Sequence, residues 1–193
     1  MAREAGLRGA LAGARRVVIL GVGQELEGDD GAGMEIARLF RRLRRAQGAA
    51  LGRAASRRRP VARTILAGVA PENATLALRR FRPTHAVFVD AAELGLTPGQ
   101  WRVIATEEIG GVTFSTHMLP LHILARFIAS DLGCHVVVVG IEPRRLSYGE
   151  GLTPEVRRGA RNLAGSLVRA LGPTGPGASG AARASGPGRL NKI

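Results

Sequence analysis

The residues best suited to chemistry in this chain are two adjacent aspartates, Asp29 and Asp30, in a glycine-rich turn that follows the apolar run 17–20. A glycine-rich loop after a buried strand normally holds phosphate through its bare backbone N–H groups. Two carboxylates would repel phosphate, but they would attract a metal ion or a positively charged peptide. Open parallel sheets bind their ligands just beyond such strand ends. The turn therefore predicts a site for positive charge.

Two further polar residues fall at comparable places in the chain. Asp90 ends the apolar run 86–90, and His117 lies in an irregular segment before an expected helix. Two carboxylates and an imidazole suit a first-row divalent metal ion with open coordination positions. A cation would also relieve the repulsion between carboxylates that share a cleft. We therefore predict that Asp30, Asp90 and His117 converge and act as the metal-contacting and catalytic residues.

Each of these polar residues also has a structural interpretation. Asp30 could cap the helix that follows it, and for Asp29 we expect that capping role. Asp90 could instead be a turn residue at the end of its strand, although the alanines that follow it favour a site. The remaining histidines are expected to be structural: His85, His122 and His135.

Several common chemistries are excluded by missing motifs. The glycines around Val22 lack the third glycine of a dinucleotide-binding fingerprint, and no Gly-Lys-Ser/Thr marks a phosphate-binding P-loop. The chain has neither a His-Glu-x-x-His zinc protease helix nor a Gly-x-Ser-x-Gly nucleophile turn. A proton-sharing aspartate pair would permit acid protease chemistry, but the usual Asp-Thr-Gly loops are missing.

The hydrophobic periodicity predicts alternating strands and helices. Short apolar runs indicate strands at 17–20, 61–67, 86–90, 101–105 and 136–139, of which 101–105 alternates like an edge strand. Helical spacing of apolar residues indicates helices at 32–45, 71–81 and 119–132, and a last helix that starts at Thr153 and Pro154. This order predicts an α/β fold, a three-layer α/β/α sandwich around a mostly parallel twisted sheet of about five strands.

Length and composition indicate one domain at residues 17–171 of the 193. Residues 1–16 are expected to form a basic N-terminal extension, poorly ordered or partly helical, and the Gly/Pro/Ala/Ser-rich residues 172–193 a disordered tail. The single cysteine, Cys134, excludes an internal disulfide and is expected to be buried. With no bilayer-length apolar run and no convincing signal peptide, we expect a cytoplasmic protein without membrane insertion.

The formal net charge of +13 raises the question of nucleic acid. Much of the excess lies in the segment 41–59 and in the two tails, away from the motifs with chemistry. Aromatic residues make up only 4% of the chain, so the arginines have no interleaved stacking platform. A solvated basic helix face with a linker at 48–60 is favoured over a dedicated nucleic-acid site. A partner with an acidic surface is a third possibility.

Five segments, occurring in order and at natural spacing, together resemble a known family: residues 21–33, 70–73, 89–92, 115–121 and 140–143. They resemble the hydrogenase maturation endopeptidases, which process the large subunit of [NiFe] hydrogenases. Pro-Glu-Asn and Ser-Thr-His-x-Leu-Pro-Leu point to the branch that serves hydrogenase-3-like and archaeal-type enzymes.

The resemblance implies an endopeptidase that removes the C-terminal extension of the large-subunit precursor after nickel insertion. It implies that Asp30, Asp90 and His117 contact nickel that belongs to the substrate, without a permanent metal or an organic cofactor. The expected partner is the precursor, and the protease is expected to be a monomer that binds no specific nucleic acid. Two features depart from the family: Gln24 replaces the usual asparagine, and the arginine-rich connection 48–60 has no recognised counterpart. The alternatives are a hydrolase with its own zinc and a basic nucleic-acid-binding α/β module.

Overall fold

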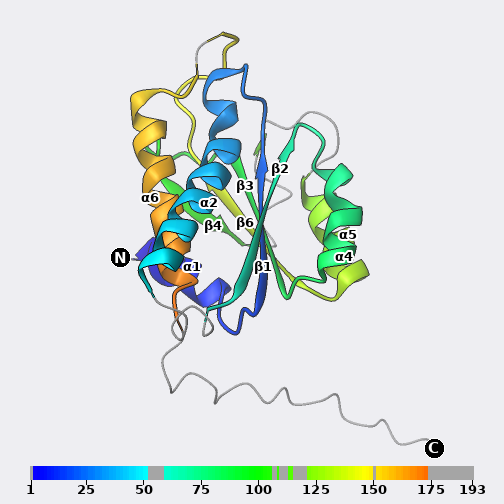
Figure 1. Cartoon of the computed structure of the whole chain (residues 1–193). Coiled ribbons are helices and arrows are strands. Elements are labelled where there is room, and N and C mark those ends of the chain that lie inside the picture. The colour runs from blue at the N-terminus through cyan, green and yellow to red at the C-terminus, as the bar shows by residue number, and fades with distance from the viewer. Residues whose placement is uncertain are drawn as a thin grey trace, which may run out of the picture.

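The computed structural model describes residues 2–51, 59–105, 108, 113–114, 121–149 and 151–173. A twisted sheet lies between two layers of helices, as Figure 1 shows. Its strands follow the order β2-β1-β3-β6-β4, and β5 pairs with β3 outside this path. This architecture confirms the predicted three-layer α/β fold.

The sheet is mostly parallel. Its main strands are β1 (Arg16–Val22), β2 (Val61–Gly68), β3 (His85–Glu93), β4 (Trp101–Ile104) and β6 (His135–Ile141). β1 runs parallel to β2 and β3, and β3 runs parallel to β6, while β4 pairs antiparallel with β6. β4 therefore forms one edge of the sheet, which confirms the edge strand predicted from its alternating pattern.

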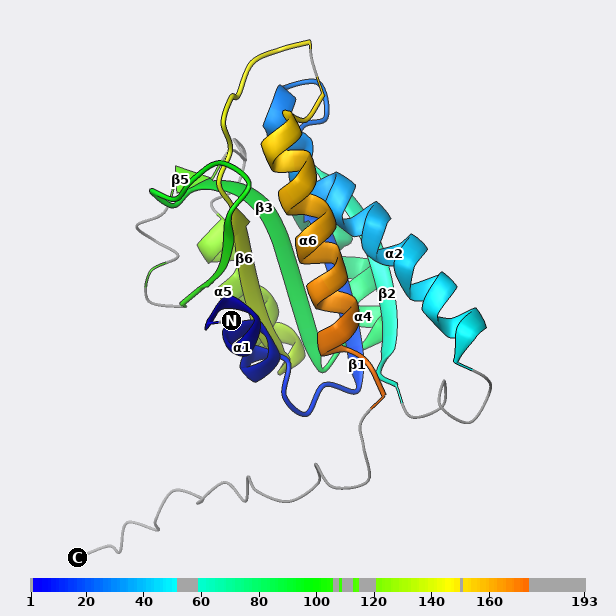
Figure 2. The same ribbon diagram turned by 90° about the vertical axis from the view of Figure 1, so that its left-hand side faces the viewer.

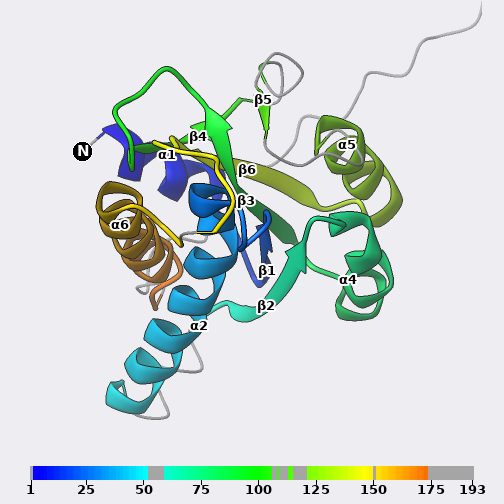
Figure 3. The same cartoon turned by 90° about the horizontal axis from the view of Figure 1, so that it is seen from above.

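Helices cover both faces of the sheet, as the view from above shows (Figure 3). One face carries α1 (Ala2–Ala10), α2 (Ala32–Ala50) and α6 (Pro154–Ala170). The other face carries α4 (Thr75–Phe81) and α5 (Leu121–Leu132). Two short 3-10 helices, η1 (Gly28–Gly31) and η2 (Pro71–Ala74), precede α2 and α4. Among the described residues, no helix combines the length and apolar character needed to cross a bilayer.

The alternation of side chains along β1 explains why both faces need helices. Val17 and Ile19 pack with α1, α2 and α6, whereas Val18 and Leu20 pack with α4 and α5. All four side chains are fully buried. A parallel strand buried on both faces reads as a continuous apolar run, which is the pattern that predicted β1.

The N-terminal segment packs as part of this unit. Residues 1–16 were expected to form a basic extension that is poorly ordered or partly helical. The helix α1 in this segment covers the sheet next to β4 and α6 (Figure 2). Leu7 and Leu11 bury their side chains in the core. Their burial is the physical reason for an ordered helix, because two leucines remove enough apolar surface from water to hold it in place. Residues 174–193 of the expected tail lie outside the described residues.

The basic helix α2 is longer than its apolar spacing predicts and is not solvated all round. It continues to Ala50, and the arginine-rich residues 52–58 lie outside the described residues. Arg44, expected on the solvated face, is only 9% exposed and donates to the carbonyl groups of Leu171 and Pro60. Burial lowers the pKa of Arg44 to about 10. This arginine therefore ties α2 to the end of α6.

Candidate functional site

The candidate site lies where the strand order of the sheet reverses. From β1 the chain moves to β2 on one side and then to β3 on the other, so β1 and β3 flank the switch point. Gly21 pairs with Val89, and Asp90 is the next residue along β3. In open α/β sheets, ligands bind beyond the carboxyl ends of the strands at such a switch point, so a binding crevice is expected at this edge. Asp30 follows β1 and Asp90 lies near the end of β3, so both belong to this edge.

Asp30 is held in a tight loop between β1 and α2. Its side chain is 1% exposed, and its Oδ2 accepts a hydrogen bond of 2.6 Å from the backbone N–H of Gln24. Its Oδ1 is buried and has no hydrogen-bond donor among the described residues. A buried carboxylate oxygen without a partner costs free energy. Such an atom is an open ligand position for a cation.

Asp30 is not a helix cap, the alternative that the sequence left open. Gly31 is the N-cap residue of α2, and no side chain caps this helix end. The loop closes tightly because Gly23 has a φ of +118° and lies against Asp30: a Cβ at Gly23 would be 1.9 Å from the Asp30 carbonyl oxygen. Only glycine adopts such a conformation without strain. Gln24 stands where the resemblance described above would place an asparagine. It binds Asp30 through its backbone N–H, so this contact does not depend on the side chain.

The first turn of α2 packs directly against β1 and β3 at the switch point, and Gly33 makes the closest approach. A Cβ at Gly33 would lie 2.1 Å from the Val89 carbonyl oxygen and 2.3 Å from that of Val22. The helix can therefore approach both strands only because this residue has no side chain. The same contact fixes the height of Asp30 above the sheet.

We expect Gly33→Ala to lower the free energy of unfolding by about 1–3 kcal/mol or more, because both clashing atoms belong to the backbone. Urea denaturation measures the change. The matched control is Gly6→Ala in α1, where nothing lies within 4 Å of the added Cβ. It should be neutral or stabilising, since alanine has the higher helix propensity. Equal stability of the Gly33→Ala and unaltered proteins would contradict the close packing.

Asp90 occupies the β3 side of the crevice. Its side chain is fully buried, and its Oδ1 accepts a hydrogen bond of 2.9 Å from the backbone N–H of Ala91. Asp90 pairs with Gly140 of β6, one pair before the end of a continuous register. It is therefore a residue within a strand and not part of a turn at its end. The turn interpretation is wrong, and Asp90 belongs to the rigid part of the sheet.

The third predicted residue, His117, lies outside the described residues. The chain before it is placed by β5 (Thr113–Phe114), which pairs antiparallel with Ala92 and Glu93 at the end of β3. Within the described part of the chain, no three His, Cys, Asp or Glu side chains cluster as metal ligands. The structure therefore brings Asp30 and Asp90 to one edge, and the placement of His117 stays a prediction.

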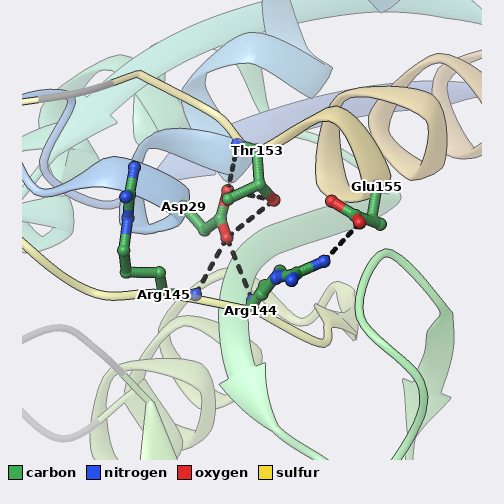
Figure 4. A network of polar contacts seen from close by, with 5 residues as sticks. All are labelled: Asp29, Arg144, Arg145, Thr153 and Glu155. Atoms are coloured by element: carbon green, nitrogen blue, oxygen red, sulfur yellow. Dashed lines mark hydrogen bonds and ion pairs between the residues drawn. The ribbon is translucent and has the colours of Figure 1, made fainter.

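Asp29 has a role that its sequence context did not predict (Figure 4). It is fully buried, and its carboxylate accepts hydrogen bonds from the backbone N–H groups of Arg144, Arg145 and Thr153 at 3.0, 3.0 and 2.7 Å. The Thr153 hydroxyl donates to it as well. The expected helix-capping role is wrong. Asp29 instead fastens the loop between β6 and α6 to the loop that carries Asp30.

The hydrogen bonds of Asp29 also determine how α6 begins. Thr153 is the N-cap residue and Pro154 follows it, as predicted. Its hydroxyl, however, makes no capping hydrogen bond to the helix, because it points to Asp29. The sequence signal for a helix start was therefore correct, while the partner of the hydroxyl is 124 residues away.

Glu142 is a positioning residue that the sequence analysis did not single out. Its Oε2 accepts hydrogen bonds from the backbone N–H groups of Leu94 and Leu96, at 2.7 and 3.0 Å. It thereby holds the chain that leaves β3 just after Asp90. A carboxylate directly after the buried strand β6 was the available signal, the same signal that identified Asp90.

Two of the remaining histidines lie at the opposite end of the sheet. His85 starts β3, is 4% exposed, and stacks on His135 at the start of β6 with ring centroids 4.9 Å apart. Burial, together with the nearby His135, lowers the pKa of His85. His122 lies in the first turn of α5. Cys134 is buried as predicted, and burial raises the pKa of its thiol.

Comparison with known protein families gives one match that covers most of the chain. The family model described as HycI, hydrogenase maturation protease, matches residues 53–170. The hydrogenase 3 maturation protease of Escherichia coli K12 is 32% identical over 141 residues, which make up 72% of this chain and 81% of that protein. These matches agree with the resemblance carried by the sequence motifs.

Solved structures give the same result. The crystal structure of a [NiFe] hydrogenase maturation protease, HycI from Thermococcus kodakarensis KOD1, matches with a TM-score of 0.70 at 27% identity. That match covers 86% of this chain and 97% of the other. The solution structure of the endopeptidase HycI from Escherichia coli matches with a TM-score of 0.61 at 31% identity and covers 80% of this chain and 90% of the other. The switch point that carries Asp30 and Asp90 therefore lies in a fold shared with these proteins.

Proposed function

Because this chain belongs to the HycI family of hydrogenase maturation proteases and is thus an endopeptidase, we propose that it removes the C-terminal extension of a [NiFe] hydrogenase large-subunit precursor after nickel insertion. The nickel belongs to the substrate. The protease contacts it through Asp30, Asp90 and His117, and it holds neither a permanent metal nor an organic cofactor. It acts as a monomer in the cytoplasm.

The observation that carries this proposal is the orphaned carboxylate oxygen of Asp30 at the switch point. Asp30 Oδ1 is buried without a donor among the described residues, and the fully buried Asp90 lies near the end of the adjacent strand. Carboxylate oxygens and imidazole nitrogen together suit a first-row divalent ion. A nickel ion that arrives with the precursor would satisfy Asp30 and compensate the negative charge of both aspartates.

Chain connectivity also supports the inclusion of His117. Phe114, three residues before it, pairs with Ala92, which is two residues beyond Asp90. Three residues of extended chain span at most about 10 Å. The proposal places His117 within this reach of Phe114, where its imidazole would join the two carboxylates.

This arrangement makes nickel a checkpoint for cleavage. Coordination of the metal supplies binding energy only when the precursor carries it, and that energy positions the scissile peptide in the crevice. A precursor without nickel would leave the buried Oδ1 of Asp30 without a partner. The protease then distinguishes nickel-loaded from nickel-free precursor because it binds the loaded form more tightly.

We expect the protein to truncate nickel-loaded large-subunit precursor and to leave the nickel-free precursor intact. Mass spectrometry of the large subunit after incubation measures both reactions, and the two forms of one precursor serve as each other's control. Equal truncation of both forms would contradict nickel reading. Failure to truncate the loaded form of every precursor encoded with this protein would contradict the processing function itself.

A further inference from the structure

A groove lined by arginines runs along the start of α6. Its volume is about 820 Å³, and all the charged residues that line it are arginines: Arg144, Arg145, Arg157, Arg158 and Arg161. No carboxylate lines this groove among the described residues. It therefore concentrates positive charge on one side of the molecule, whereas a solvated face usually mixes both signs.

The arginines of α6 are available to a partner. Arg158 and Arg161 are exposed and make no hydrogen bond or ion pair with any described residue. Their spacing of three residues places them on the same face of the helix. Arg157 donates to the Leu152 carbonyl. Arg144 pairs with Glu155, and Figure 4 shows this pair. Two guanidinium groups of the groove thus have no partner in the described part of the chain.

The groove reaches the loop that carries Asp30. A second hollow of about 410 Å³ shares Gly151, Leu152, Arg157 and Arg161 with it. This second hollow is also lined by Gly28 and Gly31, which flank the two aspartates, and by Glu25 and Glu35, of which Glu25 pairs with Arg38. The Asp29 hydrogen bonds fasten these walls to one another. The position of the groove relative to the Asp30 loop is consequently fixed by the fold.

We propose that this arginine groove binds an acidic segment of the precursor while Asp30 and its neighbours hold the nickel site. The inference rests on the proposed function, because it names a second contact of the same substrate. A substrate whose peptide bond is cut at the crevice continues beyond that bond on both sides. Asp and Glu side chains in that continuing chain pair with Arg158 and Arg161, and planar guanidinium groups bind carboxylates in a bidentate manner.

The groove favours an acidic polypeptide over nucleic acid. The residues that line it include no aromatic side chain on which bases could stack. Its continuity with the loop of Asp30 also connects it to a crevice that receives a polypeptide. Guanidinium groups at the rim of such a contact contribute to association and to specificity.

The kinetic test compares Arg158→Gln/Arg161→Gln with Arg41→Gln/Arg45→Gln on the nickel-loaded precursor. Arg41 and Arg45 are exposed on α2 outside the groove, so both variants lose the same charge and long-range attraction is matched. The groove variant is expected to raise KM about five- to tenfold with little change in kcat, as for the loss of two exposed ion pairs. The control variant should retain the KM of the unaltered protein. Equal KM values for the two variants would overturn the proposal.

A binding test separates this proposal from the proposed function, because it requires no cleavage. Fluorescein-labelled deca-glutamate is titrated into the unaltered protein and both variants at low salt, and fluorescence anisotropy reports binding. If only the groove variant loses deca-glutamate binding, the result supports the proposed binding site even if no precursor is cut. Equal binding by both variants overturns it even if processing is normal. A thymidine decanucleotide is titrated at the same salt concentration. If it binds more tightly than deca-glutamate and loses this binding in the groove variant, an acidic polypeptide is overturned as the occupant.

Discussion

Replacing Asp30 by asparagine is expected to reduce processing of the nickel-loaded precursor at least about a hundredfold, since loss of groups that merely orient metal ligands already costs 10- to 100-fold. The amide keeps the size of the side chain and one oxygen for the Gln24 N–H group, which donates at 2.6 Å. It loses the charge with which Oδ1 would bind the metal ion. Single-turnover truncation assays measure the rate.

The stability of Asp30→Asn should stay within about 1 kcal/mol of the unaltered protein or rise, because a buried atom without a donor is a cost in the folded state. The matched control is Asp131→Asn, which removes a carboxylate from the exposed pair with Arg79 at the far end of α5. Its processing rate should be unchanged. An Asp30→Asn protein that folds and still processes the precursor at the normal rate would remove Asp30 from the site.

The neighbouring substitution, Asp29→Ala, is expected to act on stability. Three backbone N–H groups, those of Arg144, Arg145 and Thr153, would lose their acceptor together. At about 1–3 kcal/mol for each group left without a partner, the free energy of unfolding should fall by about 3 kcal/mol or more. Urea denaturation measures the loss. Hydrogen exchange should also accelerate at these three amides, because they open with the loop.

The exposed carboxylate of Asp131 again provides the comparison. Asp131→Ala removes one surface ion pair and should leave the unfolding transition almost unchanged, because exposed pairs contribute little. If Asp29→Ala unfolded at the same urea concentration as Asp131→Ala, the loop between β6 and α6 would not depend on Asp29. The two adjacent aspartates would then lose the division of roles that the hydrogen bonds assign to them.

The fold could be predicted from the sequence because its signals are local. The run 17–20 is apolar at every position, which only a strand buried on both faces requires. Helix α6 was recognised from Thr153 and Pro154 and from the helical spacing of its apolar residues. The ends of the helices were harder to predict. Helix α2 extends to Ala50 through small and basic residues that have no apolar period, because Arg44 fastens that end to Pro60 and Leu171.

The candidate site was predictable in part for the same reason. A carboxylate at the end of a buried parallel strand must lie at the ligand edge of the sheet, which identified Asp90 and the turn containing Asp30. The prediction that a histidine completes the site stays a prediction, because His117 lies outside the described residues. Glu142 carried the same strand-end signal, and its sequence neighbours do not reveal that its acceptor atoms serve Leu94 and Leu96.

The sequence by itself determined that carboxylates follow buried strands and that they meet at one edge, because strand direction and burial are encoded in local apolar patterns. Only the tertiary structure decided which aspartate does what. A buried carboxylate takes the backbone N–H groups that surround it, and those around Asp29 come from residues more than a hundred positions away. Asp30, one residue later, faces its own loop and keeps one oxygen without a donor among the described residues. Adjacent identical residues thus acquire separate roles, since hydrogen-bond partners are assigned by packing.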